Sequence, residues 1–218
     1  MSGSEAPIPQ LPDLDRVEKR DRGALPHWEV EGGVYFLTFR LQDALPSELL
    51  EQWKGELGLL KEGERIDEPD LNRAEQRRLR RLLSEKVQDY LDRGEGECHL
   101  RKPEIAELVS GSMMHFEGER YEQYAWSVMP NHIHTVFRPD EGNSLSGLVE
   151  SWKTYTARRA NRKLDREGRF WQRGYFDRLI RDKADFLAKV RYTFGNPDEA
   201  GLEDWEFRWI RHAQWLEE

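Results

Sequence analysis

The chain has 218 residues, of which 37% are hydrophobic and 35% are charged, which suits one domain with additions or two very small ones. No apolar run is long enough to span a membrane, no signal-peptide pattern is present, and the single cysteine, Cys98, excludes an internal disulfide. We therefore expect a cytoplasmic protein without a membrane partner. The net charge of −8 argues weakly against nucleic acid as a partner.

The charge is unevenly distributed along the chain. Residues 151–191 contain 13 Lys or Arg and 5 Asp or Glu, a local charge of +8 inside an acidic protein. Such a segment either binds an acidic partner, nucleic acid above all, or forms a solvated helix face.

Hydrophobic periodicity and turn residues define the expected elements. Residues 1–24 are rich in proline and charge and predict a flexible tail. Runs of β-branched and aromatic residues predict four strands, at 34–41, 124–129, 132–137 and 175–181. Apolar residues at helical spacing predict five helices, at 46–63, 70–93, 103–116, 143–164 and from Asp182 to Asn196-Pro197.

The order of these elements predicts the fold class. Once a helical insertion at 46–100 is set aside, the order from residue 25 to 202 is β-α-β-β-α-β-α. This is the ferredoxin-like α+β pattern, an antiparallel sheet with helices on one face, plus an extra C-terminal helix. Residues 203–218 form an acidic, tryptophan-rich C-terminal tail, which either covers a site or packs on the domain.

A pair of histidines stands on one expected strand. Side chains two residues apart on a strand point to the same face, so His132 and His134 can converge on one divalent ion while Ile133 packs in the core. A single H-x-H pair is also compatible with an incidental pair at a strand edge.

A tyrosine and an asparagine stand one turn apart on the last expected helix. Tyr192 and Asn196 have i, i+4 spacing, and the apolar stripe of that helix centres roughly opposite Tyr192. We therefore expect Tyr192 to be exposed. An ordinary surface tyrosine is the alternative.

Basic residues are interspersed with aromatic ones in the segment between the histidine pair and Tyr192. Such a pattern holds phosphates while it stacks unpaired bases, although the aromatic residues could equally belong to the core. The residues predicted to bind DNA are Lys153, Arg158, Arg159, Arg162, Trp171 and Arg173.

Five motifs in this order resemble the REP-associated tyrosine transposases, a branch of the single-tyrosine HUH transposases. They are Leu25-Pro26-His27-Trp28, Tyr35-Phe36-Leu37-Thr38-Phe39-Arg40, Met129-Pro130-Asn131-His132-Ile133-His134, the segment from Phe170 to Arg178, and Tyr192-x-x-x-Asn196-Pro197. The resemblance implies that His132 and His134 are metal ligands, that Asn196 completes the metal site and that Tyr192 is the nucleophile. Tyr175 also lies in a motif, but an aromatic residue in an expected strand is typical of packing.

The resemblance implies cleavage and rejoining of single-stranded DNA beside a hairpin, through a 5′-phosphotyrosine and with Mg²⁺ or Mn²⁺ as cofactor. Two imidazoles and an amide favour Mn²⁺. No small-molecule cofactor is expected, and the chain is expected to act as a monomer or homodimer. A catalytically silent hairpin-binding protein and an unrelated metal-dependent hydrolase are the alternatives. The hydrolase would need an acidic third ligand, which the sequence does not reveal.

Overall fold

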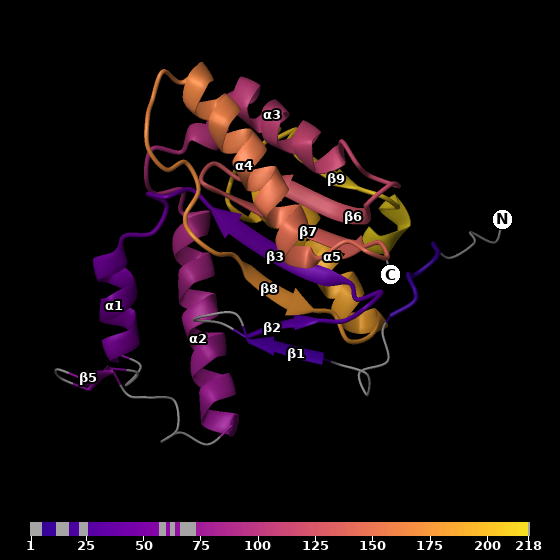
Figure 1. The fold of residues 1–218 in the computed structure, drawn as a ribbon, viewed down its shortest axis with the longest axis horizontal. Coiled ribbons are helices and arrows are strands. Elements are labelled where there is room, and N and C mark those ends of the chain that lie inside the picture. The colour runs from indigo at the N-terminus through magenta and orange to yellow at the C-terminus, as the bar shows by residue number, and fades with distance from the viewer. Residues whose placement is uncertain are drawn as a thin grey trace.

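A computed structural model describes residues 6–11, 18–21, 26–56, 60–61, 64–65 and 73–217. Its centre is a five-stranded antiparallel sheet with the strand order β8-β3-β7-β6-β9 (Figure 1). The strands are β3 (Tyr35–Arg40), β6 (Tyr121–Val128), β7 (His132–Pro139), β8 (Phe176–Leu179) and β9 (Arg208–Ile210). The first four have the ferredoxin-like arrangement, so the predicted α+β fold class is confirmed.

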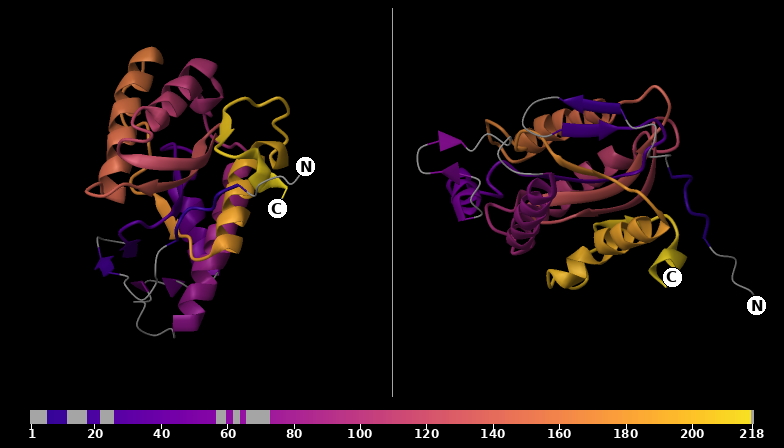
Figure 2. Two further views of the ribbon diagram at one scale, coloured as in Figure 1. Left: turned by 90° about the vertical axis from the view of Figure 1, so that its right-hand side faces the viewer. Right: turned by 90° about the horizontal axis from the view of Figure 1, so that it is seen from below.

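Helices cover both faces of this sheet (Figure 2). On one face, α3 (Pro103–Met114) and α4 (Leu145–Lys163) pack on Leu37, Phe39 and Ile133. On the other, α5 (Lys183–Glu199) packs on Phe36 and Val136. Because successive side chains of a strand point to opposite faces, β3, which is buried from Tyr35 to Phe39, supplies both cores. The extra C-terminal helix of the prediction is thus the helix that covers the second face of the sheet.

The chain between β3 and α3 contains the predicted helical insertion. It comprises α1 (Ser47–Glu56), β4 (Leu60–Lys61), β5 (Glu64–Arg65), α2 (Arg73–Asp92) and the 3₁₀ helix η3 (His99–Arg101). The last turns of α2 reach the sheet, where Leu91 joins the core. The insertion is therefore attached to the domain at the end of its longest helix. None of the helices in the described part of the chain is long and apolar enough to cross a membrane.

Both expected tails contain ordered structure. Near the N-terminus, β1 (Glu18–Asp21) pairs with β2 (Pro26–Glu29), and residues 6–11 pack on the α5 side of the sheet. Near the C-terminus, β9 extends the sheet beside β6, and the 3₁₀ helix η4 (Ala213–Leu216) buries Trp215 completely. The prediction of a flexible tail fails for the described part of residues 1–24, and the C-terminal segment packs on the domain.

The last helix also runs further than expected. Proline was expected to end it at Asn196-Pro197, but α5 continues to Glu199 with Pro197 inside it. Proline removes one backbone hydrogen bond of the helix. The final turn is completed by the backbone amide of Ala200, which donates to the backbone carbonyls of Asn196 and Asp198. Asn196 is therefore held within regular helix and not at a fraying end.

Candidate metal centre and tyrosine

His132 and His134 begin β7 and point to the same face of the sheet, as their spacing predicts. Both are completely buried, and their Nε2 atoms lie 2.9 Å apart. Phe36 stacks on the His134 ring with a centroid distance of 5.4 Å. Two imidazole nitrogens held this close can share one cation.

Each imidazole is oriented by a neighbouring polar group through its other nitrogen. Asn131 donates from Nδ2 to the Glu95 carbonyl, which leaves its Oδ1 to accept from Nδ1 of His132 at 2.7 Å. The proton of His132 is thereby placed on Nδ1, and Nε2 keeps its lone pair. Thr38 Oγ1 lies 2.8 Å from Nδ1 of His134 and, since a hydroxyl can accept as well as donate, allows the same tautomer there.

Two further residues that contact the histidines come from the end of α2 and were not predicted from the sequence. Asp92 Oδ1 lies 3.4 Å from His132 Nε2, and Gln88 Nε2 lies 3.1 Å from His134 Nε2 and 2.9 Å from Asp92 Oδ1. Their spacing of four residues places both on one face of the helix. That spacing was the only available signal, because nothing in the sequence links the insertion to β7.

The end of α5 brings Asn196 and Tyr192 to the same place. Asn196 is buried, and its Nδ2 lies 3.4 Å from Asp92 Oδ1. The Tyr192 ring contacts the rings of His134 and Phe36 with centroid distances of 5.3 and 5.8 Å. The expectation of an exposed tyrosine is wrong, because the sheet and α2 cover the flank of α5 that carries it.

Burial displaces the pKa values of these groups. It lowers the pKa of both histidines; for His132, Asp92 opposes this effect, and for His134 the charges of His132 and Lys189 add to it. Burial also raises the pKa of the Tyr192 phenol above its usual value, and three carboxylates raise it further. They belong to Asp92, Glu199 and Asp89. Without a bound cation, the imidazoles and the phenol are therefore held neutral.

The donor atoms fit a metal ion. One ligand atom from each of Asp92, His132 and His134 lies within 4.8 Å of the other two. The Oδ1 of Asn196 and the hydroxyl of Tyr192 are buried and have no hydrogen-bond partner among the described residues. Buried oxygens without partners are costly, and a cation together with a bound phosphate would satisfy them.

The residues predicted to bind DNA divide into two groups. Arg158, Arg159, Arg162 and Arg173 are exposed. Lys153 instead donates to the carbonyls of Gln172 and Gly174 at 2.7 and 2.6 Å, and burial lowers its pKa to about 8.

Trp171 is also placed differently from the expectation of a base-stacking surface. Its ring packs on Phe39 in the core, and its Nε1 donates to Thr156 Oγ1 at 2.9 Å. Trp171 and Lys153 thus fix the segment that carries Arg173. This segment lies beside the end of β3, because the Gln172 amide donates to the Arg40 carbonyl and Arg40 pairs with His132.

Comparison with known proteins agrees with this geometry. Residues 102–190, which include both histidines and the first half of α5, match the family described as "Transposase IS200 like". This segment of the chain is similar to the IS200-like transposases. A Haemophilus influenzae protein named REP-associated tyrosine transposase is 28% identical over 117 residues, 47% of this chain and 66% of that protein. The resemblance to these transposases inferred from the motifs is confirmed.

A solved structure of a REP-associated tyrosine transposase bound to a REP hairpin is also similar. It has a TM-score of 0.49 and 16% sequence identity, over 86% of this chain and 82% of that chain. The family match ends at Val190 and begins at Lys102. Tyr192, Asn196 and the whole insertion with Asp92 therefore lie outside the segment that the IS200-like family shares.

Proposed function

We propose that the chain cleaves and rejoins single-stranded DNA beside hairpin sequences, through a covalent 5′-phosphotyrosine on Tyr192. The observation that carries this proposal is the meeting of a buried tyrosine hydroxyl without a partner and a cluster of metal-ligand side chains. His132, His134 and Asp92 contact one another, and Asn196 extends the cluster to the helix of Tyr192. The partner would be hairpin DNA with an unpaired flank.

The metal would be held by His132, His134, Asp92 and Asn196. A mixture of imidazole nitrogens with carboxylate and amide oxygens suits Mn²⁺ and also admits Mg²⁺. When bound, the ion would polarise the scissile phosphate and offset the burial that disfavours the phenolate. Gln88 now lies among three of these ligands, so its amide would turn aside as the ion enters.

The remaining chemistry belongs to the side chains. The Tyr192 oxygen loses its proton and forms a bond to phosphorus, the bond from phosphorus to the 3′ oxygen breaks, and that oxygen gains a proton. Lys189 lies against the reacting side chain, with its Nζ 5.2 Å from the centroid of the Tyr192 ring. A new 3′-OH can attack the phosphotyrosine and reverse the step, so strands are exchanged without ATP.

The substitution Tyr192→Phe tests this proposal. It removes only the oxygen, so hairpin binding should persist while the covalent adduct disappears. The measurement is a denaturing gel after incubation of a labelled hairpin oligonucleotide with Mn²⁺. The matched control is Tyr175→Phe, because Tyr175 packs on the opposite core of the sheet and its variant should still form the adduct.

The same gel distinguishes the alternatives. Asp92 supplies the acidic ligand that a metal-dependent hydrolase would need, so this alternative gains support from the structure. A hydrolase would cut the DNA without becoming labelled, and a silent hairpin-binding protein would do neither. Labelling of the Tyr192→Phe protein together with loss of labelling in Tyr175→Phe would refute Tyr192 as the nucleophile.

A further inference from the structure

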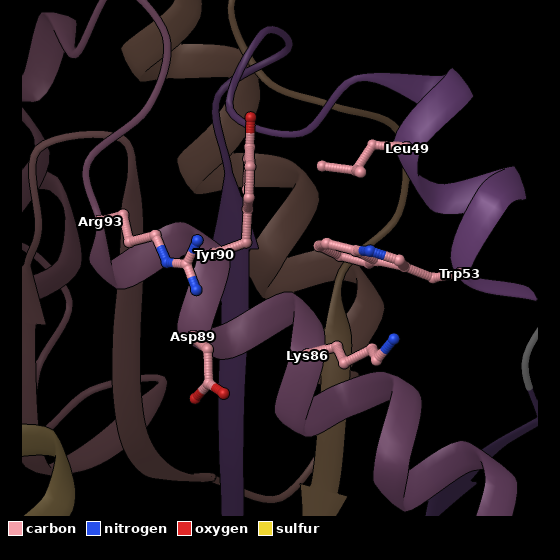
Figure 3. A pocket seen from close by; sticks show the side chains of 6 residues that line it. All are labelled: Leu49, Trp53, Lys86, Asp89, Tyr90 and Arg93. Atoms are coloured by element: carbon pink, nitrogen blue, oxygen red, sulfur yellow. The ribbon is translucent and has the colours of Figure 1, made fainter. Parts of the chain in front are cut away.

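An open pocket lies between the two helices of the insertion (Figure 3). Its volume is about 330 Å³. Leu49 and Trp53 of α1 form one wall, and residues of α2 form the other. The α2 residues are Lys86, Asp89, Tyr90 and Arg93. Nothing in the proposed cleavage reaction uses α1, so the pocket needs a separate explanation.

The pocket combines aromatic surface with cationic and hydrogen-bonding groups. Trp53 and Tyr90 meet edge to face with a centroid distance of 5.7 Å, and both side chains are only partly buried. Lys86 lies 6.0 Å from the centroid of the Trp53 ring, and its ammonium group is paired with the Glu56 carboxylate at 2.6 Å. Among the described residues, no carboxylate forms an ion pair with the exposed guanidinium of Arg93. Exposed aromatic rings beside cations are the means by which proteins stack unpaired bases and hold their phosphates.

The position of the pocket links it to the candidate metal centre. Asp89 lines the pocket, and its carboxylate is also close enough to raise the pKa of Tyr192. Gln88 and Asp92, its neighbours on α2, contact the two histidines. The pocket and the candidate metal centre are therefore both formed in part by the last turns of α2.

We propose that this pocket binds one unpaired nucleobase of the DNA flank, stacked against Trp53 or Tyr90 with a neighbouring phosphate at Arg93. The proposal rests on the proposed function, because it takes single-stranded DNA as the substrate. The Asp89 carboxylate accepts hydrogen bonds only, so it would select a base that presents an exocyclic amino group. The insertion would then choose which position of the flank is held beside the tyrosine.

The test is a scan of abasic positions with the full-length protein. Hairpin oligonucleotides carry one abasic site at each flank position, and their affinities for wild type and Trp53→Ala are measured by fluorescence anisotropy. One abasic site should weaken wild-type binding about tenfold, the usual effect of losing one stacked base. The same abasic site should leave the affinity of the Trp53→Ala protein almost unchanged. At every other flank position, an abasic site should lower the affinity of both proteins equally.

Two further variants guard against a folding defect. Trp53→Phe keeps an aromatic face and should restore most of the sensitivity at that one position. Arg93→Gln alters only an exposed side chain and should bind the hairpin more weakly than wild type. This difference in affinity should become smaller as the salt concentration rises. If every abasic site lowers the affinity of Trp53→Ala as much as that of wild type, the pocket binds no base. Formation of the Tyr192 adduct in the same experiment would show that the proposed function still holds. If wild type neither binds the hairpin nor forms the adduct, the proposed function fails and this inference fails with it.

Discussion

Asn131 shows how one side chain can set the chemistry of another. Its amide is held by the Glu95 carbonyl and presents only an acceptor to Nδ1 of His132. This contact fixes which nitrogen of His132 is free to bind a metal. Neighbouring residues that orient a ligand in this way are as much a part of a metal site as the ligands themselves.

We expect Asn131→Ala to weaken Mn²⁺ binding about 10- to 100-fold, the usual cost of losing the partner that orients a histidine ligand. The measurement is isothermal titration calorimetry of the metal-free protein at pH 7.5. Asn161→Ala is the control, because the Asn161 amide also bridges a backbone carbonyl and a side chain but does so at the end of α4. Equal affinities of the Asn131→Ala and wild-type proteins would show that His132 needs no such orientation.

Single-residue predictions succeeded where local spacing determines geometry. The i, i+2 spacing on a strand placed His132 and His134 together, and the i, i+4 spacing placed Tyr192 beside Asn196. Exposure of Tyr192 could not be inferred in this way, because a helical wheel does not show which other elements cover its flanks. Asp92 was missed for the same reason, since an insertion carries it to β7.

At the scale of elements, α4 separates two kinds of basic residue that look alike in the sequence. Lys153 borders the buried stripe of Leu148, Val149 and Trp152 and is used to hold the loop before β8. Arg158 and Arg159 lie further along the helix and face solvent. The charge pattern predicted a basic surface but could not show which of its members have backbone partners.

We expect the double variant Arg158→Ala, Arg159→Ala to bind hairpin DNA more weakly and with a smaller dependence on salt. Each lost phosphate contact should reduce the slope of log affinity against log salt by about 1. The measurement is a titration by fluorescence anisotropy at several salt concentrations.

Lys153→Ala provides the contrast. Because its ammonium group holds two carbonyls, the variant should unfold at a lower temperature while keeping the wild-type salt slope. A salt slope that is unchanged in the double arginine variant would mean that this face of α4 is only solvated surface.

Short terminal elements were the least predictable part of the fold. The segment that forms β9 contains alternating Trp205, Phe207 and Trp209, which pack toward the α4 side of the sheet. This alternation is a strand pattern, but three residues are too few to be distinguished from a tail without the partner strand. The antiparallel core, in contrast, could be read from strands and helices of ordinary length.

For the whole molecule, the candidate metal centre joins distant parts of the chain. The insertion contributes Asp92, the sheet contributes His132 and His134, and the last helix places Asn196 beside Asp92. Stability of the fold should therefore depend on whether these groups carry protons or a cation. We expect this cluster to couple the pH of the solution to the packing of α2 and α5 on the sheet.

We expect the metal-free protein to lose stability as the pH falls below about 6.5, the usual pKa of histidine. Burial lowers the pKa of His132 and His134 in the folded chain, so below this pH the unfolded chain binds more protons than the folded one. Protons then favour unfolding, and the stability present above pH 6.5 declines until the folded histidines are protonated too. The measurement is urea unfolding followed by circular dichroism between pH 8 and pH 5.

The double variant His132→Gln, His134→Gln identifies the source of this decline, since all other titrating groups are unchanged in it. Its stability should vary less with pH over the same range. Mn²⁺ should stabilise wild type at pH 7.5 more than at pH 5, because a metal binds only neutral imidazole, and it should not stabilise the double variant. A decline equally steep in both proteins would mean that the buried histidines do not couple folding to pH.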